Sequence, residues 1–529
     1  MHWFDELYPS IEAFLADQEQ VVCNAGLSVS GLQHVGRLRG EIVLNHFIAA
    51  RLRAAGRTVT QHLVLYTQDR WKGSPEQVAR FRPGEGGAYA GYRMIEVPDP
   101  HGCHANWVEH YWDGFAGPME RFAPGVVVTR TTDLYRTEEM QALVRQLADR
   151  ADEVREIVNR YRPRNPHPRG WIPFEPLCLT CRRIGESRAL GFTDGEVEYA
   201  CECGGKGSSP LELGKLNWRI EWPALWSLLQ VDVEPFGKDH ATPGGSRETS
   251  QVLVETVLGI RAPFGIPYEW VGYAHNGEDQ GDMDSSGFVG FGPETWLELA
   301  DPEVLRFLFA SVPIRRRLVL DLAQVDAYHQ RYDQAEAAHY EGSEDEASRA
   351  YLLAQLAPPP EEAPFQLPYR HASLLAQVAP ADDRAGWALA RLNETGLLAG
   401  ESSAWERDRI ARRLDQARRW AQAYAPALLR VEVQRELPAE AAAGLEASEK
   451  EALGLLHAAL SDVPWQEGAI KEAMVRLTQG GDLPVSTKRF FAALYTVLLG
   501  KPSGPRAAPL LAVLDRTFVL GRLEEASGG

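Results

Sequence analysis

The stretch Asn24-Ala25-Gly26-Leu27-Ser28-Val29-Ser30-Gly31-Leu32-Gln33-His34-Val35-Gly36-Arg37 joins an apolar run to a helical pattern near the start of the chain. Residues 21–24 predict a short buried strand, the glycines and serines predict a tight turn, and residues 38–50 have helical periodicity. His34 and the Gly36 amide are therefore expected at a helix N-terminus, where free N–H groups and the helix dipole favour a phosphate. The stretch indicates an α/β domain with an anion site at the turn, and a packed turn without a ligand is the alternative.

Composition limits the class of protein. The chain has 529 residues, 44% of them apolar, and a formal net charge of −18, so it can bury several cores. No apolar run approaches the roughly 18 residues of a membrane span, and residues 1–6 lack the features of a signal peptide, so we expect a cytoplasmic protein without a membrane partner. The charge argues against general adhesion to nucleic acid. Basic clusters at 315–317, 409–419 and 501–506 could bind it locally, or could be solvated faces.

The composition changes near residue 330. Strand-like runs at 62–66, 125–129 and 231–235 lie among helices and many glycines and prolines, as an α/β domain requires, and the chain is mostly helical from Asp321 onward. Residues 340–345 and 357–364 have the composition of a linker. In the predicted helix at 409–424, apolar residues recur every three or four positions, which predicts one buried stripe with the arginines outside. The stripe consists of Ile410, Leu414, Ala417, Ala421 and Tyr424.

Four of the six cysteines have the spacing of a metal site. They follow the pattern C-x2-C, nineteen residues, C-x-C, and are Cys178, Cys181, Cys201 and Cys203. Two close pairs of thiolates can meet at one tetrahedral ion, and without a secretory signal a zinc knuckle is favoured over disulfides. We predict a structural zinc ion there.

A second group of ligand types lies in and after the Pro98-Asp99-Pro100-His101-Gly102-Cys103-His104 loop. Its candidate members are Asp99, Cys103, His104 and His110. An oxygen, a sulfur and two nitrogen ligands could close a tetrahedral zinc site, with the two histidines a helical turn and a half apart. Hydrogen-bonded structural histidines are an equally good interpretation of these residues by themselves.

Together these segments resemble the class I lysyl-tRNA synthetases, the archaeal and scattered bacterial type, over almost the whole chain. The stretches that carry the resemblance are 30–36 (SGLQHVG), 98–104 (PDPHGCH), the four cysteines, 215–223 (KLNWRIEWP), 234–240 (EPFGKDH) with 244–246 (GGS), 267–270 (PYEW), 302–307 (PEVLRF) and 495–506. The resemblance implies a Rossmann-type parallel-sheet catalytic domain over 1–290 with zinc-binding insertions at about 95–215. It also implies a helical stem-contact region over 291–355 and an α-helical anticodon-binding domain over 356–529.

The resemblance also implies an activity and its residues. The activity is ATP- and Mg²⁺-dependent formation of lysyl-adenylate and transfer of lysine to the 3′ end of a tRNA, expected to be tRNA(Lys), by a monomer. The implied catalytic residues are His34, Gly36, Arg37, Lys238, Asp239 and His240. ATP would contact Ser30, His34, Gly36, Gly237, Asp239, His240, Gly244, Gly245, Met283, Ser285 and Ser286. The amino acid would contact Gly26, Ser28, Glu41, Trp218, His240 and Tyr268. The resemblance places the family's second zinc ligands on Asp99, Cys103, His104 and His110.

The chain departs from the family pattern at the chemistry. The family's mobile Lys-Met-Ser-Lys-Ser-like signature aligns with Asp282-Met283-Asp284-Ser285-Ser286-Gly287, which has neither lysine. Losing one preorganised donor typically costs on the order of 10²- to 10³-fold in rate. Arg37 and Arg247, which stand where the family has asparagine and tyrosine, could restore positive charge.

The acidic residue expected to bind the lysine ammonium is displaced. The family has its glutamate directly after the arginine that follows the His-x-Gly motif, whereas this chain has Gly40 there and Glu41 one step on. One residue turns a helical side chain by ~100°. Either a local adjustment brings Glu41 to the site, or the substrate is another amino acid. A non-catalytic paralogue that binds tRNA or an adenylate is the second hypothesis, favoured by the aspartates at 282 and 284.

Overall fold

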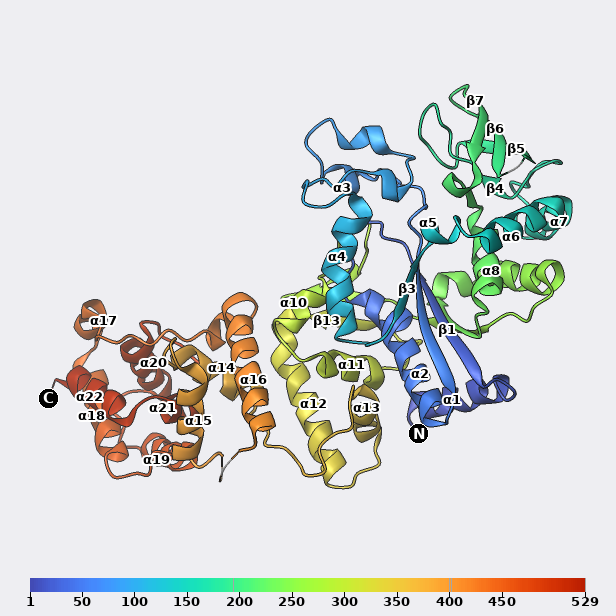
Figure 1. Ribbon diagram of the computed structural model, residues 1–529. Coiled ribbons are helices and arrows are strands. Elements are labelled where there is room, and N and C mark those ends of the chain that lie inside the picture. The colour runs from blue at the N-terminus through green and yellow to red at the C-terminus, as the bar shows by residue number, and fades with distance from the viewer. Residues whose placement is uncertain (194, 399, 401, 529) are drawn as a thin grey trace. The chain divides into compact units, whose positions relative to one another are not determined.

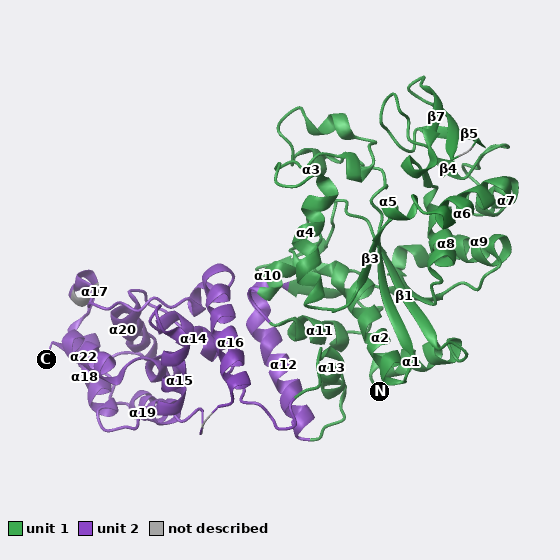
Figure 2. Cartoon of the chain, viewed as in Figure 1, with its two compact units in different colours: residues 1–297, 301–320, 342–359 green, residues 298–300, 321–341, 360–529 purple. Residues whose placement is uncertain are grey.

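The computed structural model describes residues 1–193, 195–398, 400 and 402–528, which divide into two compact units. Unit 1 comprises residues 1–297, 301–320 and 342–359, and unit 2 comprises residues 298–300, 321–341 and 360–529 (Figure 2).

A five-stranded sheet forms the centre of unit 1 (Figure 1). Its strands are β1 (Gln20–Leu27), β2 (Thr58–Leu65), β3 (Val127–Arg130), β9 (Val233–Gly237) and β10 (Phe264–Tyr268). The order is β10-β9-β1-β2-β3 and every neighbouring pair is parallel. The chain builds outward from β1 to β3 on one side and then returns to β9 on the other. This arrangement confirms the predicted Rossmann-type sheet, whose order reverses between β1 and β9.

Helices connect and flank these strands. The helices of unit 1 are α1 (Trp3–Phe14), the π-helix η1 (Leu38–Leu44), α2 (Asn45–Ala54), α3 (Pro75–Val78), α4 (Trp107–Glu120), α5 (Thr131–Leu134), α6 (Glu138–Asp149), α7 (Ala151–Arg160), α8 (Trp218–Leu229), α9 (Ser246–Leu253), α10 (Pro293–Leu297), α11 (Pro302–Ser311) and α13 (Glu346–Ala354). Helix α8 is apolar along most of its length, and its Trp222 and Trp226 are buried with Val231 and Phe236. These two tryptophans are therefore core residues.

Three smaller sheets complete unit 1. They consist of β4 (Phe174–Glu175) with β8 (Lys215–Leu216), of β5 (Ser187–Thr193), β6 (Glu196–Cys201) and β7 (Lys206–Pro210), and of β11 (Val271–His275), β12 (Glu278–Asp282) and β13 (Leu318–Asp321). The second is an antiparallel meander, in which Cys201 ends β6 and Cys203 lies in the turn between β6 and β7. In the third, β11 lies between β12 and β13.

The regular elements described in unit 2 are helical. They are α12 (Val325–Tyr340), α14 (Tyr369–Val378), α15 (Arg384–Glu394), α16 (Ala404–Ala423), α17 (Ala439–Gly444), α18 (Ala447–Leu460), α19 (Glu467–Gln479), α20 (Thr487–Leu499), α21 (Ala507–Val513) and α22 (Arg516–Ser527), with a short 3₁₀ turn before α12 and another after α16. Helix α16 begins with a capping box between Ser403 and Glu406. The predicted helical C-terminal part is confirmed.

One prediction about α16 is wrong. Its apolar stripe is buried as expected from Ile410 to Ala421, but Arg409 and Arg413 are buried beside it rather than left outside. Arg413 donates to both carboxylate oxygens of Asp333 at 3.0 and 2.9 Å, and Arg409 pairs with Glu336 at 2.6 Å. Helix α12 presents these carboxylates to α16, so the two arginines are internal ion pairs and not a cationic face. Tyr424 lies just past the end of the helix and is only half-buried.

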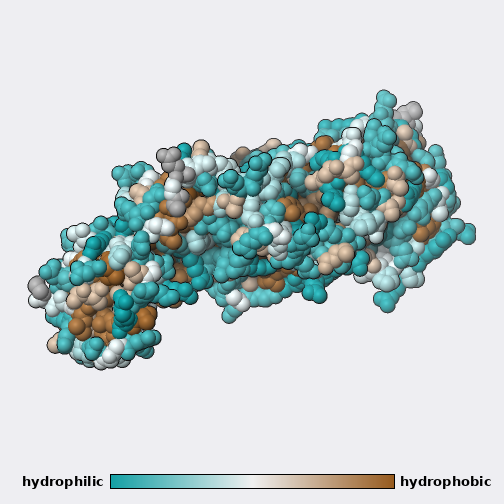
Figure 3. Space-filling view, turned by 90° about the horizontal axis from the view of Figure 1, so that it is seen from below, coloured by the Kyte–Doolittle hydropathy of each residue, from teal (hydrophilic) through white to brown (hydrophobic). Residues whose placement is uncertain are grey.

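The face of the molecule in Figure 3 is mostly hydrophilic, with separate apolar patches. Among the described residues, the helices lack the combination of length and apolarity that a membrane crossing requires.

Candidate active site and metal centres

The turn after β1 places His34 and Gly36 at the start of a helix, as predicted. His34 is buried, and burial holds its pKa well below the usual value, with Arg37 adding to the effect, so the imidazole is neutral at pH 7. Its Nδ1 has no hydrogen-bond partner among the described residues. A side chain at Gly36 would come within 2.8 Å of that atom, so the close approach requires glycine. The turn therefore places a neutral imidazole beside the Gly36 amide, whereas the Arg37 and Leu38 amides donate to the carbonyls of His34 and Val35.

The helix after this turn is not a regular α-helix. Residues Leu38–Leu44 form the π-helix η1 before α2 begins. A π-turn holds one more residue than an α-turn, and such bulges occur often at functional sites. A Cβ at Gly40 would lie 2.3 Å from the ring of Tyr268, so a glutamate cannot occupy the position where the family has one. All seven residues of the π-helix are buried, Glu41 among them.

Glu41 is 4% exposed and lies beside Arg37 and Tyr268. Arg37 Nη1 is 3.2 Å from Glu41 Oε1, while Oε2 has no partner in the described part of the chain. Burial raises the pKa of Glu41, and the charge of Arg37 and the Tyr268 hydroxyl partly offset this effect. A buried carboxylate with one unsatisfied oxygen is costly unless a ligand supplies a donor.

Aromatic rings gather at the end of β9 and the start of α8. The Trp218 ring lies 5.6 Å from the rings of both Tyr66 and His240, and His240 Nδ1 is 2.7 Å from Ser246 Oγ. A Cβ at Gly26 would lie 2.5 Å from the Tyr66 ring, so the chain passes this ring closely. Among the predicted amino-acid contacts, Trp218 and His240 are therefore brought together, with Gly26 beside the neighbouring Tyr66.

Below these rings lies a buried carboxylate that sequence reasoning missed. Glu234 in β9 accepts hydrogen bonds from Asn24 Nδ2 at 3.0 Å and Trp222 Nε1 at 3.2 Å, and also from Trp226. It ties β1 to β9 under the site. The only sequence signal was an acidic residue inside an apolar strand.

The Gly-Lys-Asp-His segment follows β9 at the same edge of the sheet as the turn after β1. Gly237 ends β9, and residues Lys238–Ala241 form the 3₁₀ turn η5. Lys238 and Asp239 are exposed, and Lys238 Nζ is 2.6 Å from Glu269. Gly244 has a φ of +72°, which favours glycine, and Gly245 caps α9. Ligands bind at this switch point in open parallel sheets.

The signature loop, residues 282–287, lies against the turn after β1. Met283 and Ser285 are buried, and a Cβ at Gly31 would lie 2.3 Å from the carbonyl oxygen of Ser285. Arg37 Nε is 3.3 Å from Ser285 Oγ. Asp284 accepts from the amide and the hydroxyl of Ser286 at 2.9 and 3.0 Å. The structure thus joins the signature loop to the turn after β1 through Arg37.

A second arginine at this loop was seen in the sequence only as part of a basic cluster. Arg317, just before β13, pairs with Asp282 and Asp279 at 2.5 Å each. Arg247 is placed differently: its guanidinium lies 4.4 Å from the Trp226 ring and donates to the Pro263 carbonyl. Of the two arginines expected to restore positive charge, Arg37 is bonded to the signature loop, as Arg317 also is, whereas Arg247 packs in the core.

Both predicted ligand groups assemble. In each, the four ligand atoms lie within 4.8 Å of one another. In the first group the Cys178–Cys203 and Cys181–Cys201 sulfur pairs are each 3.7 Å apart. Four thiolates at this spacing fit a tetrahedral zinc ion.

The second group lies partly exposed at the start of α4. Cys103 Sγ lies 3.1 Å from His104 Nδ1 and 3.3 Å from His110 Nδ1, and Asp99 lies 3.3 Å from His110. Only His110 is on a helix; His104 precedes the Asn106 cap, so the predicted helical spacing between the two histidines is wrong. The loop closes on itself because Asp99 accepts the amides of Cys103 and His104. The mixed donor set also fits zinc.

Comparison with protein families covers most of the chain. Residues 1–357 match the family model described as tRNA synthetases class I (K), and residues 407–527 match an anticodon binding domain. The chain is 40% identical to a lysine–tRNA ligase of Aeropyrum pernix over 100% of its length and 98% of the relative. It is 30% identical to a lysine–tRNA ligase of Haloarcula marismortui over 98% of its length and 96% of that protein.

Among solved structures, a glutamate tRNA ligase from Elizabethkingia meningosepticum aligns over 96% of this chain and 99% of its own, with 11% identity and a TM-score of 0.42.

Proposed function

The chain belongs to the class I tRNA synthetase family specific for lysine, and we propose that it uses ATP to activate lysine as lysyl-adenylate and transfers the lysyl group to tRNA. We assign catalysis to residues 1–290, with the zinc-binding insertions, contact with the tRNA stem to 291–355, and anticodon binding to 356–529. A monomer in the cytoplasm is our prediction for its working state.

The observation that supports lysine as the substrate is the unsatisfied Oε2 of Glu41. The lysine ammonium would supply the hydrogen-bond donor that this buried oxygen lacks. Tyr268 and Trp218, with Gly26 and Ser28 on the chain leaving β1, would enclose the aliphatic part of the side chain. The π-helix would compensate for the shift of the acidic residue from position 40 to position 41, because it would present Glu41 where an α-helix would present Gly40.

In the adenylation step the lysine carboxylate attacks the α-phosphate of ATP and pyrophosphate leaves. Charge develops on the phosphoryl oxygens, which fixed donors stabilise. His34 would donate as a neutral imidazole, together with the Gly36 amide and the Arg37 guanidinium. On the other side His240, oriented by Ser246, and the segment Gly237 to Asp239 would hold the adenylate, with Gly244 and Gly245 at the start of α9. ATP would enter with Mg²⁺.

The absence of both signature lysines favours the alternative, a paralogue that binds tRNA or an adenylate without catalysis. Arg37 supports the enzyme instead, because it is the cation that lies between the turn after β1 and Ser285. Met283, Ser285 and Ser286 would then contact ATP from the opposite side of the nucleotide.

We assign one structural zinc ion to the four cysteines and a second to Asp99, Cys103, His104 and His110. The first would join the loop before β5 to the end of β6, and the second would fix the loop before α4. Neither ion would take part in adenylation, since structural zinc contributes folding energy.

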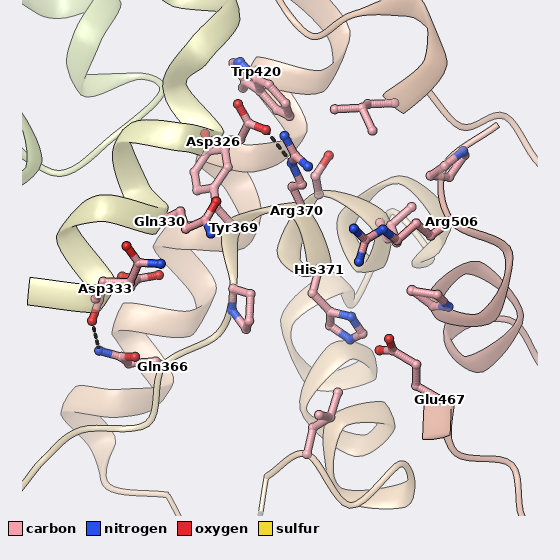
Figure 4. Close-up of a pocket in the computed structure, with 18 of the residues that line it drawn as sticks. Asp326, Gln330, Asp333, Gln366, Tyr369, Arg370, His371, Trp420, Glu467 and Arg506 are labelled. Atoms are coloured by element: carbon pink, nitrogen blue, oxygen red, sulfur yellow. Dashed lines mark hydrogen bonds and ion pairs between the residues drawn. The ribbon is translucent and has the colours of Figure 1, made fainter. Parts of the chain in front are cut away.

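A cavity in unit 2 supports contact with an unstacked tRNA base. It has a volume of about 630 Å³ and is lined from α12, α14 and α19 and by Arg506. His371, Glu467 and Arg506 project into it, and Arg370 pairs with Asp326 at its wall (Figure 4). Burial lowers the pKa of His371 to about 4, so its ring is neutral at pH 7. Splayed bases in RNA loops are recognised by such mixed donors and acceptors, and Arg506 could meet a phosphate.

The test is pyrophosphate exchange with each proteinogenic amino acid, run with and without tRNA. Exchange with lysine alone is expected. Exchange with another amino acid would retain the ligase and overturn its substrate. No exchange with any amino acid, together with tRNA binding, would establish the paralogue.

A further inference from the structure

Ion pairs between one arginine and two aspartates hold the start of the signature loop. Asp282 begins the loop, and Asp279 lies opposite Ala274 in the β11–β12 pair. Arg317 reaches both: its Nε is 2.5 Å from Asp282, and its two Nη atoms are 2.5 and 3.0 Å from the two oxygens of Asp279. A bidentate pair with a third bond fixes direction as well as distance.

The path of Arg317 crosses the sheet. Arg317 precedes β13, which lies on the opposite side of β11 from β12, so its side chain must pass over β11 to reach the two aspartates. It does so at Gly272, where a Cβ would lie 2.3 Å from Arg317 Nη2. Gly272 is paired directly with Asp282. The strand therefore leaves the room that the guanidinium requires.

The rest of the loop is fastened as well. Asp284 and Val289 exchange two backbone hydrogen bonds of 3.0 Å, and the Arg80 guanidinium lies 3.8 Å from the Phe288 ring. Because Arg317 faces two carboxylates, the three groups together carry a formal charge of −1. Arg317 is therefore a poor substitute for a lysine that would face phosphate.

We propose that Arg317 is a positioning residue for adenylation: with Asp279 and Asp282 it forms a clasp that holds the signature loop against the turn after β1 before ATP binds. This inference rests on the proposed function. The family relies on lysines in a mobile loop, whereas in this chain the clasp maintains the loop position and Arg37 supplies the cation. The depressed pKa of Asp279, about 2 beside Arg317, agrees with a formed ion pair.

The test combines amide hydrogen exchange over residues 279–289 with calorimetric titration of Mg²⁺-ATP, both without amino acid or tRNA. Arg317→Gln should speed amide hydrogen exchange and weaken ATP binding about two- to fivefold, the range for exposed ion pairs. Asp282→Asn should act in the same direction, and the double variant should be no worse than Arg317→Gln alone. Arg317→Lys, which cannot make all three bonds, should be intermediate.

Arg315→Gln is the matched control, since it removes the same charge from an exposed arginine two residues away. Salt should speed exchange in the wild type but little in Arg317→Gln, because exposed pairs are screened. In pyrophosphate-exchange assays of Arg317→Gln, the KM for ATP should rise while the KM for lysine stays unchanged. General destabilisation of the protein would not separate the two constants in this way.

Tighter ATP binding by Asp282→Asn would overturn the clasp, because it would mean that Arg317 is a phosphate ligand restrained by the aspartate. An Arg317→Gln variant with unchanged amide hydrogen exchange and unchanged ATP affinity would also overturn the clasp. Neither measurement needs lysine, so a different amino-acid substrate would overturn the proposed function and leave the clasp standing. If the wild type binds no ATP, the nucleotide-positioning role fails outright.

Discussion

Replacing Glu41 by glutamine should separate lysine recognition from stability. A hydrogen bond to a charged group contributes about 1.5–3 kcal/mol, and leaving the ammonium near an unopposed Arg37 raises the loss toward the 3–5 kcal/mol of a broken buried pair. At 1.36 kcal/mol for each tenfold change, kcat/KM for lysine should fall roughly 10²- to 10³-fold, mostly through KM. The KM for ATP should remain within about twofold, since the uniform binding lost is that of lysine.

The effect on folding should have the opposite sign. Burial raises the native pKa of Glu41, so the stability linked to this group is greatest below the ordinary glutamate pKa and is lost as pH rises through the native value. At pH 7 the glutamine variant should therefore melt at the same temperature as the wild type or higher, and the difference should shrink toward pH 4. Calorimetric melting and pyrophosphate exchange measure the two effects.

Glu19→Gln is the matched control, because Glu19 is exposed in the same unit. It should change neither measurement. An unchanged lysine KM in Glu41→Gln would refute the assignment of this carboxylate to the substrate ammonium. A lower melting temperature accompanied by equal losses for lysine and ATP would show that Glu41 is structural.

Further predictions concern the zinc ions, Arg37 and two arginines of unit 2. Metal analysis should find about two zinc ions per chain, and Cys201→Ser should lose one of them and loosen residues 178–203 without weakening ATP binding; one ion in the wild type would exclude the second site and none would exclude both. Arg37→Asn should lower the rate of pyrophosphate exchange about 10- to 10³-fold at unchanged melting temperature, and a rate equal to the wild type would disprove compensation by this cation. Arg413→Ala should lower the free energy of unfolding by about 3–5 kcal/mol, because it leaves Asp333 buried and unpaired. Arg506→Glu should weaken tRNA binding and reduce its salt slope by about one without affecting stability, whereas Lys488→Glu, an exposed charge outside the cavity, should leave tRNA affinity nearly unchanged. A salt slope that does not respond to Arg506→Glu would exclude the cavity as the phosphate contact.

Local patterns in the sequence predicted an α/β first part and a helical second part, and the resemblance to a known family implied the Rossmann-type sheet. Apolar runs predicted β1, β2, β3 and β9, whereas β10 was not among the predicted strands, and the three-to-four spacing at 409–424 predicted α16. Ligand spacing predicted the four-cysteine cluster, because two cysteines separated by one or two residues are confined to one small region whatever the rest of the chain does. For Asp99, Cys103, His104 and His110 the spacing left a structural interpretation open, and the resemblance to the family favoured the ligand set that the structure brings together.

Contacts between residues distant in sequence decided what the charges do. Arg409 and Arg413 have the spacing of a solvated helix face, but their partners lie 73 and 80 residues away on α12, and only packing of the two helices buries them. Arg317 likewise acquires its role from strands more than thirty residues earlier. The position of Glu41 depends on the π-helix Leu38–Leu44 and on the Tyr268 ring, which reaches Gly40 of that helix from β10. Residue type and spacing determine which elements form and which ligands cluster locally, whereas the environment of a charge depends on its non-local neighbours, which only the tertiary structure brings together.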